Sequence, residues 1–344
     1  MKAVVYYGGD DFRWEDVETP KIGPDEVLVR VRACGLCSTD VWKAVYNRAK
    51  SGSILGHEVS GEVAETGSNV DAFEVGDRVA VYHRAECGGC YYCKHGQEPL
   101  CGQYREQSMF PGAFAEYIRA VSRLVEKSVI KLPDELTFDE ATLIEPTACS
   151  VRAVSKCGIG LGDNVLVVGD GPLGLLNAQV SKCAGASVVM LSGHHDYRLG
   201  IAGQLKIDHV FNSRKVGAKK EVMELTDGRG ADFVIVAVAS TDAVHQSMEL
   251  VRNGGKICVF GDFRDVPQPN LDLDLKLVLR DGVDILGSWG CSTQNYRVAF
   301  DLVTSGQVRV REMITHRFPL EKFAEALKLF SGKECLKIVL NPGC

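Results

Sequence analysis

The 344-residue sequence has no apolar run of membrane-spanning length and no block of consecutive basic residues. A helix needs about 20 mostly apolar residues to cross a bilayer, so no transmembrane segment is expected. The first residues carry acids early and lack the apolar core of a secretory signal. The mild net charge of −6, without a basic patch, argues against nucleic acid as a partner. We therefore expect a cytoplasmic protein with no nucleic-acid and no membrane partner.

Internal repeats and low-complexity segments are also absent from the sequence. A hydrophobic fraction of 45% and a charged fraction of 24% are typical of a globular protein, and the length suits two domains. Cysteine, in contrast, is abundant, with 13 residues. In a reducing compartment clustered cysteines bind metal more often than they form disulfides. An odd number also leaves at least one thiol outside any complete set of pairs.

Strand patterns dominate the first part of the chain. Residues 26–35, 58–67 and 76–82 cluster or alternate β-branched residues between turn-forming residues. Residues 136–158 then show a helical pattern that ends at a glycine. The first domain is therefore expected to be rich in β-structure.

Alternating strand and helix patterns follow in the middle of the chain. Residues 162–191 show a strand, a glycine-rich turn, a helix and a strand. A strand at 231–240, a helix at 243–255 and a strand at 256–262 repeat the alternation. Apolar strands in such alternation predict a parallel sheet covered on both faces, over residues 152–284. A helical pattern at 320–332 and a strand pattern at 336–342 come after it. If this tail returns to the first domain, the parallel-sheet domain is an insertion.

Four cysteines gather in the polar segment 87–101, in the pattern C-G-G-C-Y-Y-C-K-H-G-Q-E-P-L-C. Zinc takes four soft ligands at tetrahedral corners, and four thiolates without a solvent ligand make a closed, structural site. An iron–sulfur cluster is the alternative, because C-x-x-C-x-x-C also occurs in such proteins. His95 is expected to be an exposed loop residue. We predict that a structural zinc is held by Cys87, Cys90, Cys93 and Cys101.

A second set of metal-ligating residue types comes from distant segments. Cys37 lies in C-G-L-C-S-T-D, His57 and Glu58 lie in L-G-H-E-V, and Glu145 lies in L-I-E-P-T. A thiolate, an imidazole and carboxylates can hold one zinc ion and leave a position open, which makes a catalytic site. Zinc there would act as a Lewis acid on an alcohol oxygen and favour loss of hydride from the same carbon. Taken singly, each residue can also be a buried thiol, a core histidine or a helix-surface acid.

The apolar stretch Val165–Val168 is followed by a G-x-G-x-x-G turn and a helical pattern. In this context the first glycine makes the turn, the second lets a pyrophosphate approach, and the third lets helix and strand pack closely. The pyrophosphate would lie at the helix N-terminus, where free N–H groups and the helix dipole favour anions. The turn therefore predicts a Rossmann dinucleotide site made by Gly169, Gly171, Pro172, Leu173 and Gly174.

The next predicted strand should end in an acid that binds the adenosine ribose. Ser192 and Gly193 occupy that place, and Asp196 comes a few residues late. The missing acid leaves room for the 2′-phosphate of NADP, whereas ribose binding by Asp196 or by backbone groups would favour NAD. We expect NAD(P), with a slight preference for NADP, because basic residues are near: His194, His195 and Arg198.

Together these motifs resemble the zinc-containing medium-chain alcohol dehydrogenase family over essentially the full length. The most specific part is Gly56-His57-Glu58 followed by Gly61 and Gly67, which is similar to the family's zinc signature. The resemblance implies an α/β protein with a GroES-like catalytic domain and a doubly wound Rossmann domain, and an active site in the cleft. The implied domains are residues 1–151 with 285–344, and residues 152–284.

Within the family the sequence is more similar to sorbitol, threonine and polyol-phosphate dehydrogenases than to ethanol dehydrogenases. That resemblance implies that Cys37, His57 and Glu145 ligate the catalytic zinc, with Glu58 as an exchanging or alternative ligand. Two zinc ions per chain are then expected, one of them in the 87–101 lobe. Thr39 matches the hydroxyl that contacts the substrate oxygen in the family and begins the proton relay.

Two positions depart from the family pattern. Trp42 stands where a histidine often follows the first zinc cysteine, and Arg152 stands where many polyol members have a histidine. The usual proton exit is therefore changed, and water or another side chain must serve. Trp42 either narrows the substrate pocket or packs in the core. The resemblance further implies a small alcohol or ketone substrate and a homodimer or homotetramer.

Two functions other than a zinc-dependent dehydrogenase are also compatible with this scaffold. A zinc-free quinone or enoyl reductase shares the scaffold but does not need Cys37, His57, Glu145 or the cysteine lobe. The second alternative is a non-enzymatic binding protein that keeps the fold. The set of candidate ligands favours a zinc-dependent dehydrogenase that moves a hydride between a secondary alcohol and NAD(P), the alcohol being a polyol, sugar alcohol, cyclitol or amino alcohol.

Overall fold

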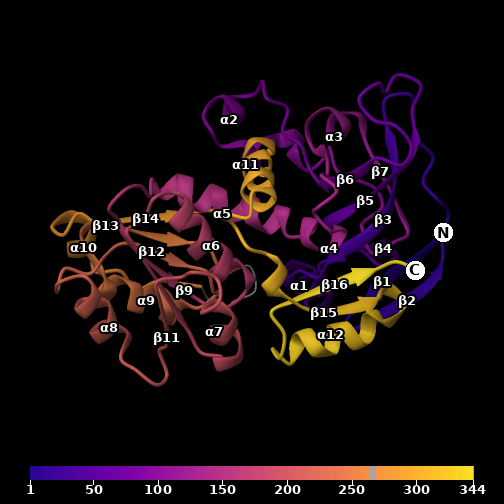
Figure 1. Ribbon diagram of the computed structural model, residues 1–344. Coiled ribbons are helices and arrows are strands. Elements are labelled where there is room, and N and C mark those ends of the chain that lie inside the picture. The colour runs from indigo at the N-terminus through magenta and orange to yellow at the C-terminus, as the bar shows by residue number, and fades with distance from the viewer. Residues whose placement is uncertain (264–268, 344) are drawn as a thin grey trace. The chain divides into compact units, whose positions relative to one another are not determined.

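The computed structural model describes residues 1–263 and 269–343, which divide into two compact units (Figure 1). The bounds of unit 1 are Met1–Ala148, Cys291–Thr304 and Ile314–Cys344. Unit 2 comprises Cys149–Gly290 and Ser305–Met313. The sequence-based boundary after residue 284 differs from this division, because it lies inside a strand of unit 2. No helix in the described residues is long and apolar enough to cross a membrane.

Unit 1 contains two sheets. In the larger one the order is β15-β16-β3-β5-β6-β8, with β7 paired to β3, and in the smaller one it is β2-β1-β4. The strands at 27–35, 58–66 and 78–82 lie where the sequence predicts them. The strands are β1 (Lys2–Gly8), β2 (Asp11–Asp16), β3 (Val27–Gly35), β4 (Ser53–Ile54), β5 (Glu58–Thr66), β6 (Arg78–Tyr82), β7 (Tyr117–Ala120), β8 (Val129–Lys131), β15 (Ile314–Pro319) and β16 (Lys337–Asn341).

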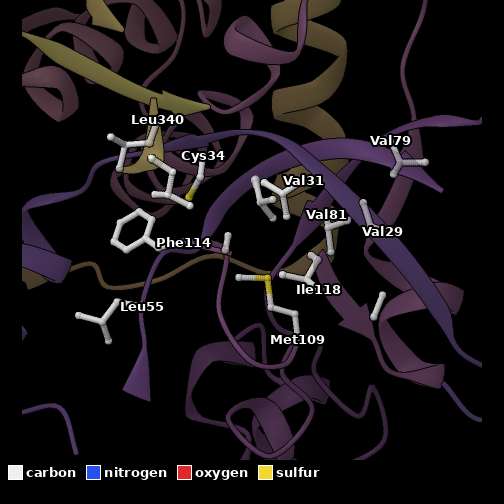
Figure 2. Packing of buried hydrophobic residues seen from close by; sticks show 14 of the residues in the cluster. Val29, Val31, Cys34, Leu55, Val79, Val81, Met109, Phe114, Ile118 and Leu340 are labelled. Carbon is white, nitrogen blue, oxygen red and sulfur yellow. The ribbon is translucent and has the colours of Figure 1, made fainter. Parts of the chain in front are cut away.

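The core of unit 1 forms where these strands turn their apolar side chains inward (Figure 2). Val29 and Val31 of β3 and Val79 and Val81 of β6 are at most 1% exposed. Leu340 of β16 belongs to the same cluster, so the end of the chain is built into the domain formed by its beginning. Burial of these side chains fixes the register of β3 against β5, because a shift of one residue would turn the apolar face to solvent.

Several helices of unit 1 are short. One helix was expected at 136–158, but the structure has two, α4 and α5, separated near Thr142. A capping box between Thr137 and Glu140 starts α4. Glu145 lies in the first turn of α5, which continues into unit 2. The helices are α1 (Ser38–Val45), α2 (Tyr91–Lys94), α3 (Ser122–Lys127), α4 (Phe138–Ala141), α5 (Ile144–Cys157), α11 (Thr293–Thr304) and α12 (Phe323–Ser331).

Unit 2 is built on one parallel sheet in the order β11-β10-β9-β12-β13-β14 (Figure 1). This confirms the predicted Rossmann-type sheet. The strands are β9 (Asn164–Val168), β10 (Val188–Gly193), β11 (His209–Asn212), β12 (Ala231–Val236), β13 (Val251–Val259) and β14 (Asp284–Gly287). The helices are α6 (Pro172–Cys183), α7 (Asp196–Ala202), α8 (Ala218–Leu225), α9 (Thr241–Leu250) and α10 (Leu275–Leu279).

Strand β13 begins five residues before the predicted position at 256. The helix expected before it ends at Leu250, because Gly254 and Gly255 follow closely and glycine is unfavourable in a helix. Gly254 has a φ of +70°, and the pairing of β13 with β12 has an irregularity near Phe233. The two glycines therefore lie in a bulged strand.

The glycine-rich turn connects β9 to α6. Gly169 has a φ of +124°, a conformation that side chains disfavour, and Gly171 is the N-cap of α6. A Cβ at position 174 would overlap the carbonyl oxygen of Gly169, whereas a Cβ at position 171 would meet nothing within 4 Å. The third glycine is thus required by packing, and the second leaves open space at the helix N-terminus.

We predict that Gly174→Ala destabilises the protein by about 1–3 kcal/mol, the usual cost of forcing an extra group into a packed site. Gly171→Ala is the matched control and should cost less than about 1 kcal/mol, because its Cβ enters open space and only the poorer N-cap preference of alanine opposes it. Urea unfolding followed by circular dichroism measures both. Equal stability of the two variants would contradict the packing argument.

Candidate functional site

The register of β3 against β5 brings three candidate ligands together in unit 1. Gly35 at the end of β3 pairs with Glu58 at the start of β5, and Cys37 follows β3 as the N-cap of α1. The ligand atoms of Cys37, His57 and Glu58 all lie within 4.8 Å of one another. The backbone N–H of Thr39 approaches the Cys37 sulfur at 3.5 Å. A thiol, an imidazole and a carboxylate thus meet at one point beside the first turn of α1.

Asp40 orients the His57 ring. Its buried carboxylate lies 3.2 Å from His57 Nδ1 and accepts a hydrogen bond from the Gly56 backbone N–H at 3.3 Å. Burial by itself would lower the pKa of His57, but the negative charge of Asp40 and the sulfur of Cys37 raise that pKa well above its usual value. A carboxylate on one ring nitrogen fixes the orientation of the other, which is the usual support of a metal-binding histidine.

Glu58 forms a buried ion pair with Lys337, a contact between the first residue of β5 and the first of β16. Both side chains are only 2% exposed, and Lys337 also donates to the backbone carbonyl of Leu36 at 3.3 Å. Burial would lower the pKa of Lys337, but Glu58 raises it above its usual value. Lys337 was not identified from the sequence, because a lysine beside an apolar strand pattern is usually exposed. Only the pairing of β16 with β3 and of β3 with β5 places it beside Glu58.

Glu145 lies near this group from the first turn of α5 but is not one of the three residues within 4.8 Å. Its carboxylate is 3.8 Å from Nδ1 of His83, and the His83 ring is 5.0 Å from the ring of His57. Burial, together with the negative charge of Glu58, raises the pKa of Glu145 to about 7, against the opposing influence of His57. His83 was not identified from the sequence; its signal is its place directly after β6.

The remaining residues of the predicted substrate region lie on α1 and α5. Thr39 is half-buried in the first turn of α1, next to the Cys37 cap. Trp42 is on the same helix, with its ring 6.3 Å from that of Tyr46. Arg152 is buried in the part of α5 that belongs to unit 2.

The cysteine lobe brings its four thiols within 4.8 Å of one another. Cys93 lies 3.9 Å from Cys87 and 3.5 Å from Cys90. Backbone N–H groups of Gly89 and Cys90 lower the pKa of Cys87 to about 6, whereas burial and neighbouring thiols raise that of Cys93 to about 12. Such splitting is expected of thiols that crowd together and share protons. A divalent cation would replace those protons. His95 is not part of this group; its Nδ1–H donates a hydrogen bond to the Tyr91 carbonyl, 2.7 Å away.

The predicted dinucleotide residues lie at two adjacent strand ends in unit 2. Gly169, Gly171, Pro172, Leu173 and Gly174 follow β9, and the parallel pairing of β9 with β10 places them beside the end of β10. The residues there are Ser192, Gly193, His194 and Arg198, of which Ser192 and Gly193 are buried and His194 is exposed. Asp170, inside the glycine motif, was given no role from the sequence.

The Asp170 carboxylate turns toward the end of β10. It accepts hydrogen bonds from the backbone N–H groups of His194 and His195, at 2.6 and 2.7 Å. Nδ1 of His195 lies 3.0 Å from it, and the guanidinium of Arg198 lies 3.8 Å away. An acid therefore does lie at the end of β10, but it comes from the preceding turn.

Comparison with known proteins identifies the class. The model of the alcohol dehydrogenase GroES-like domain matches residues 23–134, and that of the zinc-binding dehydrogenase domain matches residues 172–305. The chain belongs to the zinc-binding alcohol dehydrogenase family. This alcohol dehydrogenase is 31% identical to sorbitol dehydrogenase of Bacillus subtilis (strain 168), over 99% of this chain and 97% of the relative. It is therefore an oxidoreductase of the zinc-dependent type, related to its polyol branch.

Two further relatives support that placement. D-arabitol-phosphate dehydrogenase of Enterococcus avium is 34% identical, with 97% of this chain and 95% of the relative covered. A zinc-binding dehydrogenase of Sinorhizobium meliloti 1021, solved bound to NADP, superposes with a TM-score of 0.88 at 27% identity, with 99% of each chain covered. The matches extend over both units, so the family resemblance is not confined to one domain.

The donor sets of this alcohol dehydrogenase fit zinc at both places. Four thiols within 4.8 Å of one another suit a closed tetrahedral site, whereas a thiol, an imidazole and a carboxylate suit an open one. The open space above Gly171 at the N-terminus of α6 likewise fits a pyrophosphate.

We predict that Lys337→Met lowers the free energy of unfolding by about 3–5 kcal/mol, because it leaves the Glu58 carboxylate buried without its cation. The double variant Glu58→Gln with Lys337→Met should recover part of the loss, since it removes the unpaired charge. Urea unfolding of the two single variants and the double variant measures their coupling. Additive losses would contradict a direct charge pair.

Proposed function

We propose that this alcohol dehydrogenase transfers a hydride between a secondary alcohol and NAD(P), the alcohol being a polyol, sugar alcohol, cyclitol or amino alcohol. The observation that carries the proposal is the meeting of Cys37, His57 and Glu58, with the Glu145 carboxylate close by. Names of the relatives support the substrate class, since they include sorbitol and arabitol-phosphate dehydrogenases. Activity on a panel of such alcohols, each with NAD and with NADP, tests it.

Two zinc ions per chain are part of the proposal. Cys37, His57 and Glu145 would hold the catalytic ion, with Glu58 as the exchanging or alternative ligand, and Cys87, Cys90, Cys93 and Cys101 would hold the structural one. When bound at the first site, zinc supplies a Lewis acid for the alcohol oxygen. The ion pair with Lys337 supports a secondary role for Glu58, because part of its charge is already compensated.

The chain's own residues prepare the site for this chemistry. Asp40 fixes the His57 ring, and Lys337 pairs with the buried Glu58 carboxylate. Oγ1 of Thr39 is proposed to accept the hydroxyl proton of the substrate while passing its own proton onward, from its place next to Cys37 on α1. With Trp42 and Arg152 in place of histidines, the onward path of that proton differs from the usual one, and water is the proposed carrier.

The finer points of the cofactor and the assembly are proposals as well. From the sequence alone a slight preference for NADP is expected, through His194, His195 and Arg198 and the lack of an acid at Ser192, but in the structure Asp170 brings an acid to that place. The NADP-bound relative supports a nicotinamide dinucleotide as the cofactor class. Homodimer or homotetramer formation and a cytoplasmic location stay predictions from the sequence.

We predict that Cys37→Ser, with the fold retained, lowers alcohol oxidation by at least roughly 100-fold, because a metal ligand and its second shell control affinity and activity on this scale. Metal analysis should find one zinc per chain where the parent protein has two. Near-normal oxidation by a folded Cys37→Ser variant that still binds the dinucleotide would refute the proposed mechanism. Absence of zinc from the parent protein would instead favour a zinc-free reductase.

Cys93→Ser is the matched substitution in the cysteine lobe. It should also reduce the zinc content to one, but its main effect should be on stability, with a melting temperature lower by roughly 5 °C or more. The residual activity per zinc-loaded catalytic site should stay within about threefold of the parent, because the lobe supplies no ligand to the first site. Differential scanning calorimetry and metal analysis measure these effects. Loss of activity without loss of stability would argue against a structural zinc.

A further inference from the structure

The end of β10 contains a cluster that the dehydrogenase activity alone does not explain. Asp170 extends from the glycine-rich turn and closes over the backbone between β10 and α7. One carboxylate oxygen accepts both backbone N–H groups, of His194 and His195, and the other lies 3.0 Å from the His195 ring and 3.8 Å from Arg198. Asp170 is buried, with a side chain only 7% exposed.

Gly193 makes this approach possible. A Cβ at position 193 would overlap the Cβ and carboxyl group of Asp170, so any other residue would push the carboxylate away. The close packing of Asp170 therefore requires a glycine at position 193, the last residue of β10. The carboxylate is held in place by packing as well as by hydrogen bonds.

The charge of Asp170 stays in the folded protein. Burial would raise its pKa, but the hydrogen bonds from His195 and His194 outweigh burial and lower the pKa below its usual value. The guanidinium of Arg198 faces this carboxylate with a side chain that is only 13% exposed. The positive charge of Arg198, which the sequence suggested as a partner for the 2′-phosphate, is therefore already paired with the Asp170 carboxylate.

Asp196 is not an alternative to Asp170 as the acid at the end of β10. Its carboxylate accepts hydrogen bonds from Lys215 at 2.7 Å and from Asn212 at 2.9 Å, and its side chain is 64% exposed. It therefore forms an outward-facing surface pair, unlike the buried Asp170.

We propose that Asp170 is a specificity-determining residue that makes this dehydrogenase prefer NAD over NADP. The inference rests on the proposed function, in which a dinucleotide binds at the turn between β9 and α6. A ribose 2′-hydroxyl can donate a hydrogen bond to the carboxylate. A 2′-phosphate cannot donate one, brings its own negative charge, and finds the two backbone N–H groups already occupied. The sequence-based preference for NADP is thereby reversed.

Binding measurements on the full-length, zinc-loaded protein test the inference without relying on turnover. Isothermal titration calorimetry gives the dissociation constants of NADH and NADPH, and of 5′-AMP and adenosine 2′,5′-bisphosphate as fragments. The parent protein should bind NADH at least about tenfold more tightly than NADPH, a difference of about 1.4 kcal/mol. A parent protein that prefers NADPH would overturn the inference.

Two substitutions should shift the ratio in favour of NADPH by about tenfold or more. Asp170→Asn removes the charge with little change of shape, and Gly193→Ala displaces the carboxylate without changing the residue that carries it. Asp196→Ala is the control with the same charge change, and it should alter the ratio by less than about twofold because its carboxylate is exposed and screened.

The outcomes separate the inference from the proposed function. An unchanged ratio in folded Asp170→Asn and Gly193→Ala variants, checked by circular dichroism, overturns the role of Asp170 while the dehydrogenase function stands. A shift caused equally by Asp196→Ala overturns it too, since net charge alone would then explain the effect. If the parent protein binds neither dinucleotide, the proposed function fails and the inference fails with it.

Discussion

The Glu58–Lys337 ion pair and the Asp40–His57 contact hold a group of ionisable side chains inside unit 1. Charges buried without partners cost several kcal/mol each, so a thiol, two imidazoles and several acids can gather in an interior only if their charges compensate. Lys337 compensates Glu58, and Asp40 compensates His57. The candidate metal site depends on this compensation, and the rest of unit 1 positions the strands that supply it.

The same constraint operates in unit 2. Asp170 is buried at the end of β10, where two backbone N–H groups and the Arg198 guanidinium compensate its charge. Asp170 occupies a variable position of the G-x-G-x-x-G motif. Its carboxylate lies where the end of β10 lacks an acid of its own. In both units a buried acid is paired beside a candidate binding site.

Much of the fold could be predicted because its signals are local. Apolar periodicity located β3, β5, β6, β9 and β12, and the glycine spacing located the turn before α6. The predicted helix at 136–158 was too long, because the capping box at Thr137 starts a short helix that ends before α5. The helix before β13 was also too long, since Gly254 and Gly255 favour a bulged strand instead.

The sequence by itself determined the residue types of the site, the cysteine cluster and the turn, because spacing and chemistry are written along the chain. Tertiary structure alone decided which of these residues meet. Lys337 and His83 reach the Cys37 group from strands far away in sequence, and strand register, not spacing, brings them there. Likewise Asp170 reaches β10 only because the parallel pairing of β9 and β10 sets their ends side by side.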